Sequence, residues 1–203
     1  MNDLDKTSEL DLIAGEISNC EKCTLCKTRT KTVPGSGDYQ AEIMFVGEAP
    51  GDKEDKSGLP FCGAAGKFLD KMLESINLKR EDVFIANTVK CRPPENRDPE
   101  IIEKNACRPY LERQIALIKP KIIVCLGRHA VASMLPDQPN ISKIHGEAIV
   151  AANGIIFLPL YHPAAALHNG SLRATLLADF AKIKELIRGD YSSTPRCSEG
   201  GEV

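Results

Sequence analysis

Four runs of apolar residues recur along the chain, and each is followed by polar or glycine-rich sequence. They cover residues 42–49 (EIMFVGEA), 82–89 (DVFIANTV), 121–127 (KIIVCLG) and 154–161 (GIIFLPLY). Within each run the apolar positions are continuous rather than alternating, which is typical of strands buried on both faces of a sheet. The pattern therefore predicts four buried strands.

Between these runs, apolar residues recur with the spacing of amphipathic helices. This spacing predicts helices over residues 8–18, 64–76, 99–118, 128–135 and 172–187. We expect Asp98 to cap the third helix, with Pro99 in its first position, and Gly189 to end the last helix. Strands that alternate with helices favour an α/β fold, here a four-stranded parallel sheet flanked by helices on both faces.

Length and composition fit one globular domain over residues 1–188. The chain has 203 residues, 42% of them hydrophobic and 27% charged, as in ordinary globular proteins. Residues 189–203 are rich in Ser, Gly and Pro, which predicts a disordered tail containing Cys197. The first residues, MNDLD, contain no apolar signal segment, so we expect a cytoplasmic protein without membrane contact.

The net charge of −2 argues against a protein that coats nucleic acid non-specifically, because such proteins are usually basic. Contact with nucleic acid must then use a local basic patch. One candidate lies within residues 20–32, and a second consists of Lys90, Arg92 and Arg97. Either patch could equally be an ordinary solvated surface.

Eight cysteines are many for a chain expected in a reducing compartment, where metal binding or catalysis is the commoner use of cysteine. Residues 20–23 (CEKC) place two sulfurs close enough to share a metal, and Cys91 and Cys107 form a second pair across a loop. Four thiolates from two segments suit a tetrahedral zinc ion or a four-iron cluster. Cys26 could compete as a ligand, whereas Cys125 is expected in the core.

Polar and aromatic side chains follow the carboxyl ends of the predicted strands, where open α/β sheets bind their ligands. In chain order these residues are Glu48, Ala49, Glu54, Phe61, Asn87, the triplet 127–129 (GRH) and His162. Taken singly, each has an ordinary structural explanation, such as a solvated carboxylate, a turn-capping amide or a core phenylalanine. Because all of them are expected at the same edge of the sheet, the pattern favours a binding site there.

Four segments carry longer and more specific patterns: GEAPG at 47–51, GLPFCGAAG at 58–66, NTVKCRPPENRDP at 87–99 and YHPAAAL at 161–167. Together they resemble the motifs of the family 4, iron–sulfur uracil-DNA glycosylases, in the order found in that family. The resemblance spans about residues 20–187. It implies the fold of that family, hydrolysis of the N-glycosidic bond of uracil in DNA, and a 4Fe–4S cluster held by four cysteines, Cys20, Cys23, Cys91 and Cys107.

The resemblance implies roles that can be checked against chemistry. Uracil in a duplex is inaccessible, so its nucleotide must be flipped into a pocket. Phe61 is expected to stack on the flipped base, and the Asn87 amide to donate to uracil O4 and accept from N3–H. Cytosine lacks that pattern and would leave buried polar groups unpaired. The backbone at Ala49 is expected near uracil O2.

Cleavage produces a uracil anion and an oxocarbenium-like sugar. A donor aimed at O2 stabilises the departing anion, and we assign this role to His162 as a neutral imidazole. A carboxylate near C1′ would stabilise the sugar cation and orient water. Glu48 is the first candidate for this carboxylate and Glu54 the second.

Contacts with DNA are expected outside the base pocket. Leu167 is the candidate wedge that fills the gap left by the flipped nucleotide, and Lys90 and Arg92 are candidates for phosphate contacts. The expected partner is uracil-containing DNA, single- or double-stranded, bound by a monomer.

The chain departs from the family pattern at two places. HPA at 162–164 replaces the usual HPS, which removes a serine contact to DNA, and Cys62 stands where valine is common. A related group that binds uracil-DNA covalently has GEQPG and a basic insertion after the phenylalanine motif. This chain has GEAPG and no such insertion, which favours a turnover enzyme.

Parts of the sequence also match two other functions. His145 and Glu147 match the H-x-E of zinc deaminases, but the C-x₂-C pair precedes them and lacks the proline of that signature, so we reject this function. The remaining alternative is a non-catalytic iron–sulfur module that binds DNA or senses redox state. The side chains at the strand ends argue against it.

Overall fold

Each of the four predicted apolar runs forms a strand in the computed structural model, which describes residues 3–138 and 140–189. The strands are β2 (Ile43–Gly47), β3 (Phe84–Asn87), β4 (Ile122–Leu126) and β6 (Ile156–Leu160). They run parallel to one another in the order β3-β2-β4-β6. Every residue in them is buried, as continuous apolar runs require.

The sheet as a whole is not the purely parallel, four-stranded sheet that the sequence predicted. Two further strands, β1 (Ser36–Gly37) and β5 (Ile149–Val150), pair antiparallel with β3 and β6. Within the described residues the result is a six-stranded mixed sheet in the order β1-β3-β2-β4-β6-β5. The prediction missed these strands because two residues are too few to produce a periodic pattern.

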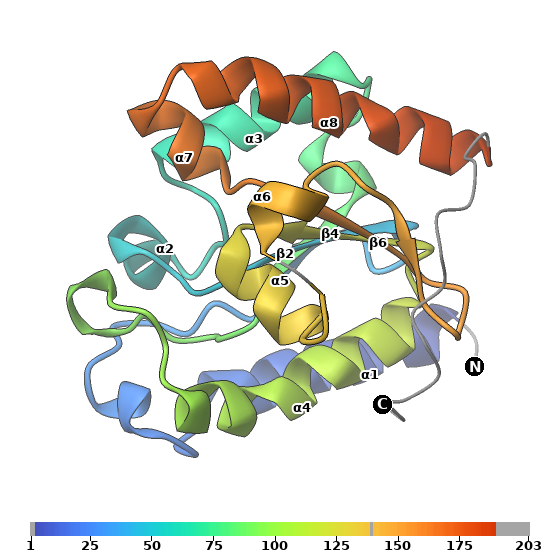
Figure 1. The fold of residues 1–203 in the computed structure, drawn as a ribbon. Coiled ribbons are helices and arrows are strands. Elements are labelled where there is room, and N and C mark those ends of the chain that lie inside the picture. Colours follow the sequence, from blue (N-terminus) through green and yellow to red (C-terminus); the bar gives the residue numbers. More distant parts are fainter. Residues whose placement is uncertain (1–2, 139, 190–203) are drawn as a thin grey trace.

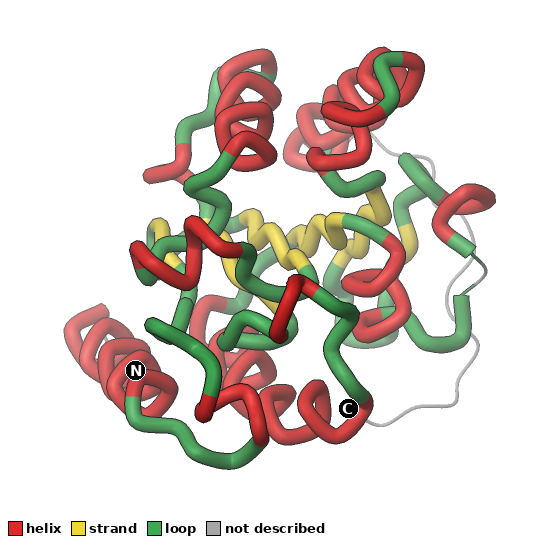
Figure 2. Tube along the Cα trace, turned by 90° about the vertical axis from the view of Figure 1, so that its left-hand side faces the viewer, coloured by secondary structure: helices red, strands yellow, loops and turns green. Residues whose placement is uncertain are grey.

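Helices cover both faces of this sheet (Figure 1). In chain order they are α1 (Asp3–Ser18), α2 (Asp52–Ser57), α3 (Ala64–Ser75), α4 (Ile101–Ile118), α5 (Arg128–Met134), α6 (Ile141–Ile144), α7 (Pro163–His168) and α8 (Ser171–Arg188). Short 3₁₀ helices cover Thr24–Lys27, Arg80–Asp82 and Pro94–Asn96. Seen from the side on which α2 lies, the strands stand between two helical layers (Figure 2). The five predicted helices are confirmed as elements, whereas α2, α6 and α7 were not predicted.

The start of α4 differs from the prediction, because Glu100 and not Asp98 is its N-cap. Glu103 accepts the Glu100 N–H at 2.8 Å, and Arg97 donates two hydrogen bonds to the Glu103 carboxylate at 2.7 and 2.9 Å. The bonds from Arg97, together with that from the Glu100 N–H, lower the pKa of Glu103 to about 2. Asp98 is thereby left outside the helix.

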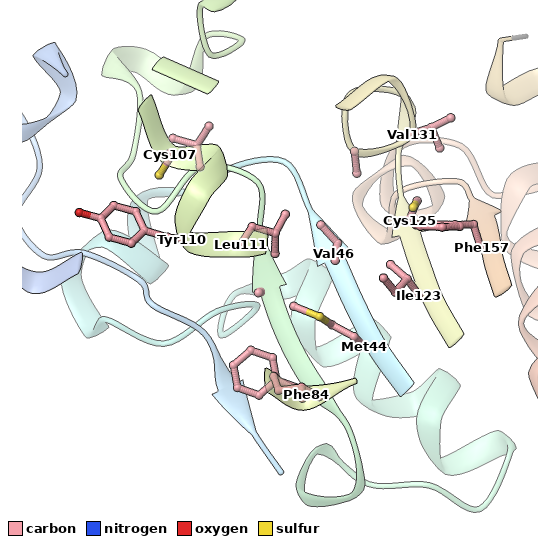
Figure 3. Packing of buried hydrophobic residues seen from close by; sticks show 14 of the residues in the cluster. Met44, Val46, Phe84, Cys107, Tyr110, Leu111, Ile123, Cys125, Val131 and Phe157 are labelled. Carbon is pink, nitrogen blue, oxygen red and sulfur yellow. The ribbon is translucent and has the colours of Figure 1, made fainter. Parts of the chain in front are cut away.

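Alternate residues of each strand point to opposite faces of the sheet, so the apolar side chains form two clusters. Met44, Val46 and Cys125 pack toward α1, α4 and α5 (Figure 3). Phe45 and Leu158 pack toward α3 and α8 on the other face. The core position predicted for Cys125 is confirmed, since this residue has 0% exposure.

The last helix ends where the predicted tail begins. Gly189 ends α8 in the left-handed conformation with φ 76°, as predicted. The remainder of the predicted tail, 190–203 with Cys197, lies outside the described residues, so its disorder stays a prediction. No helix in the described ranges is both long and apolar enough to cross a bilayer.

Phe45 provides a test of this packing. Its ring is fully buried and stacks on Phe180 with 5.6 Å between centroids. We expect Phe45→Ala to lower the free energy of unfolding by about 3–5 kcal/mol, because it leaves a cavity between β2 and α8. The measurement is denaturant unfolding, with Leu12→Ala at a position 55% exposed as the control, expected to change stability by about 0.5 kcal/mol or less. Similar losses in both variants would contradict the assignment.

Candidate active site and metal centre

Phe61, Asn87 and His162 come from distant segments and meet at the carboxyl edge of the sheet. A Cβ at Gly47, the last residue of β2, would lie 2.4 Å from Asn87 Oδ1 and 2.9 Å from the Phe61 ring. The Phe61 and His162 rings are stacked, with 5.4 Å between centroids and 28° between planes. Asn87 and Phe61 are only 2% and 6% exposed. The predicted base-binding residues are therefore brought together around Gly47.

The loop that carries Phe61 is held in an unusual backbone conformation. Phe61 has φ 50°, in the left-handed region that few non-glycine residues adopt. Arg80 donates to the carbonyl oxygens of Pro60 and Phe61, and a Cβ at Gly66 would lie 1.5 Å from Phe61 O. Strain of this kind is found where surrounding contacts hold a functional side chain in place, and here the bonds from Arg80 hold the backbone that carries the Phe61 ring.

His162 follows β6 and is the N-cap of α7. Its Nδ1 accepts the Ala164 N–H at 3.1 Å, so the neutral ring carries its proton on Nε2. Burial lowers the pKa of His162 to about 4, which keeps the ring uncharged at neutral pH. The side chain thus presents a neutral N–H donor, and its predicted role toward uracil O2 stays a prediction.

The backbone of Glu48 is held by hydrogen bonds, whereas its carboxylate makes few contacts. Its carbonyl accepts the Val89 N–H at 2.9 Å and the Thr88 hydroxyl at 2.7 Å. In a trans peptide this turns the Ala49 N–H away from β3. Within the described chain, Glu48 Oε1 is a buried oxygen with no hydrogen-bond partner. Burial and the nearby charge of Asp98 raise the pKa of Glu48 to about 7.

Glu54 has a different environment from Glu48. One of its carboxylate oxygens accepts the Gly51 N–H at 3.2 Å and the other accepts the Gly63 N–H at 3.0 Å. The side chain therefore links the start of α2 to the start of α3, on either side of the segment that carries Phe61. The two candidate carboxylates are distinguished by these contacts, since Glu54 is bound on both oxygens.

The four predicted metal ligands, Cys20, Cys23, Cys91 and Cys107, line one cavity together with Arg29 and Tyr110. Two donors point at the sulfurs: Arg29 to Cys91 Sγ at 3.4 Å and the Lys90 N–H to Cys107 Sγ at 3.2 Å. Hydrogen bonds to cysteine sulfur are a common feature around iron–sulfur clusters. Cys26 lies outside the lining of this cavity, and its N–H bonds to the Cys23 carbonyl at 3.2 Å.

Burial affects the ionisation of these thiols. It raises the pKa of Cys91 to about 11 and also raises those of Cys23 and Cys107. Metal ligation requires the thiolate, which a bound cation stabilises directly. Four cysteines that line one cavity, with N–H donors at the sulfurs of Cys91 and Cys107, therefore fit a thiolate-ligated metal centre.

The family model described as the uracil DNA glycosylase superfamily matches residues 34–186. The chain belongs to this superfamily. It is 54% identical to a type-4 uracil-DNA glycosylase of Sulfurisphaera tokodaii, over 87% of this chain and 84% of the relative. It is 40% identical to the type-4 enzyme of Thermotoga maritima, over 88% and 95%. A type-5 enzyme of Pyrobaculum aerophilum is 32% identical over 73% of each chain.

The residues predicted to contact DNA lie in different environments in this superfamily member. Lys90 is 1% exposed, and its ammonium group donates to Gln114 Oε1 at 2.8 Å, so the predicted phosphate contact is wrong. Arg92 donates to Asp52 at 3.0 Å and to Asn96 at 2.8 Å. Leu167 is 49% exposed on α7, where it is free to contact a ligand.

Several residues that shape this site have no recognisable role in the sequence. Arg80 and Gly66 hold the Phe61 loop, and no local pattern indicates that they meet it. Gly47 is recognisable only as the first residue of the GEAPG motif. His129 stands at the end of β4, in the triplet identified at the strand end, and approaches Glu48 with Nδ1 3.5 Å from Oε1.

Proposed function

We propose that this chain is a type-4 uracil-DNA glycosylase that removes uracil from DNA and leaves an abasic site. The observation that carries the proposal is the meeting of Phe61, Asn87 and His162 around Gly47, in a chain of the uracil DNA glycosylase superfamily. Relatives named type-4 uracil-DNA glycosylases match most of the chain at 40–54% identity. This supports excision as a step in DNA repair.

Recognition of uracil is assigned to a flat apolar wall and one amide. The Phe61 ring offers a surface for stacking, which contributes roughly 1–3 kcal/mol per base. The Asn87 amide is almost completely buried, so a base that fails to match its donor and acceptor leaves them unpaired at a cost of about 1–3 kcal/mol. Cytosine presents the opposite exocyclic group, and the pocket therefore selects against it.

Cleavage breaks the C1′–N1 bond, and the bonding electrons leave with uracil as an anion. The Nε2–H of His162 is placed to stabilise negative charge at O2, with the Ala49 N–H as a further donor. Water adds to C1′ and loses a proton, for which ionised Glu48 is the acceptor. The carboxylate also offsets positive charge on the sugar while the bond breaks.

Glu48 is the better candidate for this role because of its contacts. Its Oε1 is unpaired within the described residues, whereas each oxygen of Glu54 already accepts a backbone N–H. We therefore assign Glu54 to positioning: it holds the loop of Phe61 and lies near enough to His162 to raise the pKa of that ring slightly against burial.

The metal centre is proposed to be a 4Fe–4S cluster on Cys20, Cys23, Cys91 and Cys107. The four cysteines line a single cavity, and the sulfurs of Cys91 and Cys107 accept N–H donors, which supports this choice. The cluster would join the segment before β1 to the loop after β3, through Cys91, and to α4, through Cys107. Its chemistry is structural here, since the base pocket lies among other residues.

The partner is proposed to be uracil-containing DNA, single- or double-stranded, bound by a monomer in the cytoplasm. Leu167 remains the proposed wedge, supported by its exposure beside the His162 motif. Arg92 remains a proposed phosphate contact, although it must exchange its bond to Asp52 for one to DNA. The local basic groups supply affinity without reading the base.

Asn87→Asp tests both the recognition of uracil by the Asn87 amide and the proposed excision activity. Replacing the amide donor by a carboxylate places negative charge against uracil O4, so excision should fall by about 30- to 1000-fold and preference over cytosine should shrink. The measurement is alkali-labile abasic sites in oligonucleotides that carry a single uracil or cytosine. Asn153→Asp, an exposed change in the turn before β6, is the matched control and should leave excision unchanged.

Two outcomes would contradict the proposal in different ways. Wild-type protein that leaves a uracil strand alkali-stable would support the non-catalytic iron–sulfur module instead. Equal selectivity in wild type and Asn87→Asp would remove Asn87 from recognition.

Cys23→Ala and Cys125→Ala form a matched pair for the metal centre. Both replace a free thiol, but only Cys23 lines the cavity. Iron and acid-labile sulfide, measured on anaerobically purified protein, should be largely lost in the first variant and retained in the second. Zinc without sulfide in wild type would overturn the cluster assignment.

The ionisation of Glu48 predicts a pH dependence. Below its pKa of about 7 the protonated side chain cannot accept a proton from water, so single-turnover excision should fall about tenfold per pH unit on the acid side. Above that pH the rate should level off, and His162 stays neutral throughout because its pKa is about 4. Glu48→Gln should be slow and lack this rise; a rise that persists there would exclude Glu48 as its source.

A further inference from the structure

A second imidazole lies beside the Glu48 carboxylate and has no part in the mechanism above. His129, the second residue of α5, has Nδ1 3.5 Å from Glu48 Oε1 and Nε2 3.2 Å from Asp98 Oδ2. Glu48 and His129 are each 23% exposed, whereas Asp98 is 59% exposed. The ring therefore lies between a largely buried carboxylate and a solvated one.

Two groups approach Nε2 of His129, and the nearer one assigns its proton. Arg128 Nε donates to Nε2 at 2.8 Å, whereas Asp98 Oδ2 lies 3.2 Å from it, so we assign Nε2 as an acceptor and the proton of the neutral ring to Nδ1. Burial lowers the pKa of His129, which favours the neutral ring. The Nδ1–H then faces Glu48 Oε1, the buried oxygen that lacks a partner within the described residues.

We propose that His129 is a positioning residue whose Nδ1–H closes onto Glu48 Oε1 when DNA fills the site, holding the carboxylate ionised and oriented toward the attacking water. This inference rests on the proposed role of Glu48. The present separation of 3.5 Å is longer than a good hydrogen bond. Hydrogen bonds of catalytic groups often tighten only when substrate is bound, and exclusion of water by the substrate strengthens them.

Other charged groups also act on Glu48. Asp98 raises its pKa, whereas Lys104 and Arg128 lower it. Asp98 and Arg128 are 59% and 72% exposed, so water and salt weaken their influence. His129 is 23% exposed and so less exposed than either Asp98 or Arg128. The hydrogen bond proposed between His129 and Glu48 should therefore affect the ionisation of Glu48 more than these two outer charges do.

Glu48, Asp98 and His129 together have the composition of a cation site, because each places one ligand atom within 4.8 Å of the others. Arg128 argues against this use. Its guanidinium already donates to His129 Nε2 and lies 3.5 Å from Asp98 Oδ2. A divalent cation would be repelled by that positive charge, and it could not be bound by His129 Nε2, which already accepts from Arg128.

The test compares pH profiles of single-turnover uracil excision by the enzyme with its iron–sulfur centre loaded and by four variants, one of which is Glu48→Gln as the reference for the carboxylate. His129→Leu removes the donor and should move the inflection up by about one pH unit, with excision roughly tenfold slower at pH 6.5 and little changed at pH 9. His129→Asn keeps an N–H near the position of Nδ1 and should retain an inflection near that of wild type. Asp98→Asn removes a negative charge and should move the inflection down by a smaller amount.

Each contrary result has a distinct meaning. If His129→Leu slows excision by the same factor at every pH, or if His129→Leu and His129→Asn give identical pH profiles, the histidine is merely structural and the proposal is overturned. A wild-type inflection that shifts with EDTA or Mn²⁺ would assign the cluster to a cation instead. An inflection that survives in Glu48→Gln removes the role of Glu48 and this inference with it. If the inflection is lost in Glu48→Gln but is unchanged in His129→Leu, Glu48 keeps its role and only the positioning role of His129 is overturned.

Discussion

The close approach of two side chains to the backbone of Gly47 determines the geometry of the pocket. Any side chain at this residue would overlap Asn87 Oδ1 and the Phe61 ring, so glycine is required for the strand end, the amide and the aromatic ring to meet. Phe61 also stacks on His162, which ties the segment after β6 to the same point. The bonds from Arg80 and the clamp formed by Glu54 hold the Phe61 loop against this strand end.

Around this pocket, chemically identical side chains are given different tasks by their neighbours. The Nδ1 of His162 accepts a backbone N–H and leaves its proton on Nε2, whereas His129 accepts on Nε2 and carries its proton on Nδ1. Likewise Glu54 is bound on both oxygens, and Glu48 keeps an unpaired buried oxygen within the described residues. Environment, not residue type, therefore separates structural from reactive groups here.

The sequence predicted the parallel strands because burial on both faces requires continuous apolar runs, and it predicted the strand-end residues because parallel strands end at one edge. It missed α2, whose residues DKEDKS contain no apolar position, since contacts made by Glu54 help to hold that turn. It also misplaced Lys90, because a charged residue in a basic run gives no sign that its side chain turns inward to Gln114. Such contacts are tertiary and leave no local pattern.

The outermost strands of the sheet have a consequence for the behaviour of the chain. β1 and β5 contain two residues each and cover β3 and β6 with antiparallel pairs. A long bare edge exposes a row of unpaired backbone groups on which another polypeptide can add a strand, and short edge strands restrict this reaction. The paired halves of β3 and β6 are thus closed to the addition of a strand from another molecule, and the outer strands are too short to act as templates themselves.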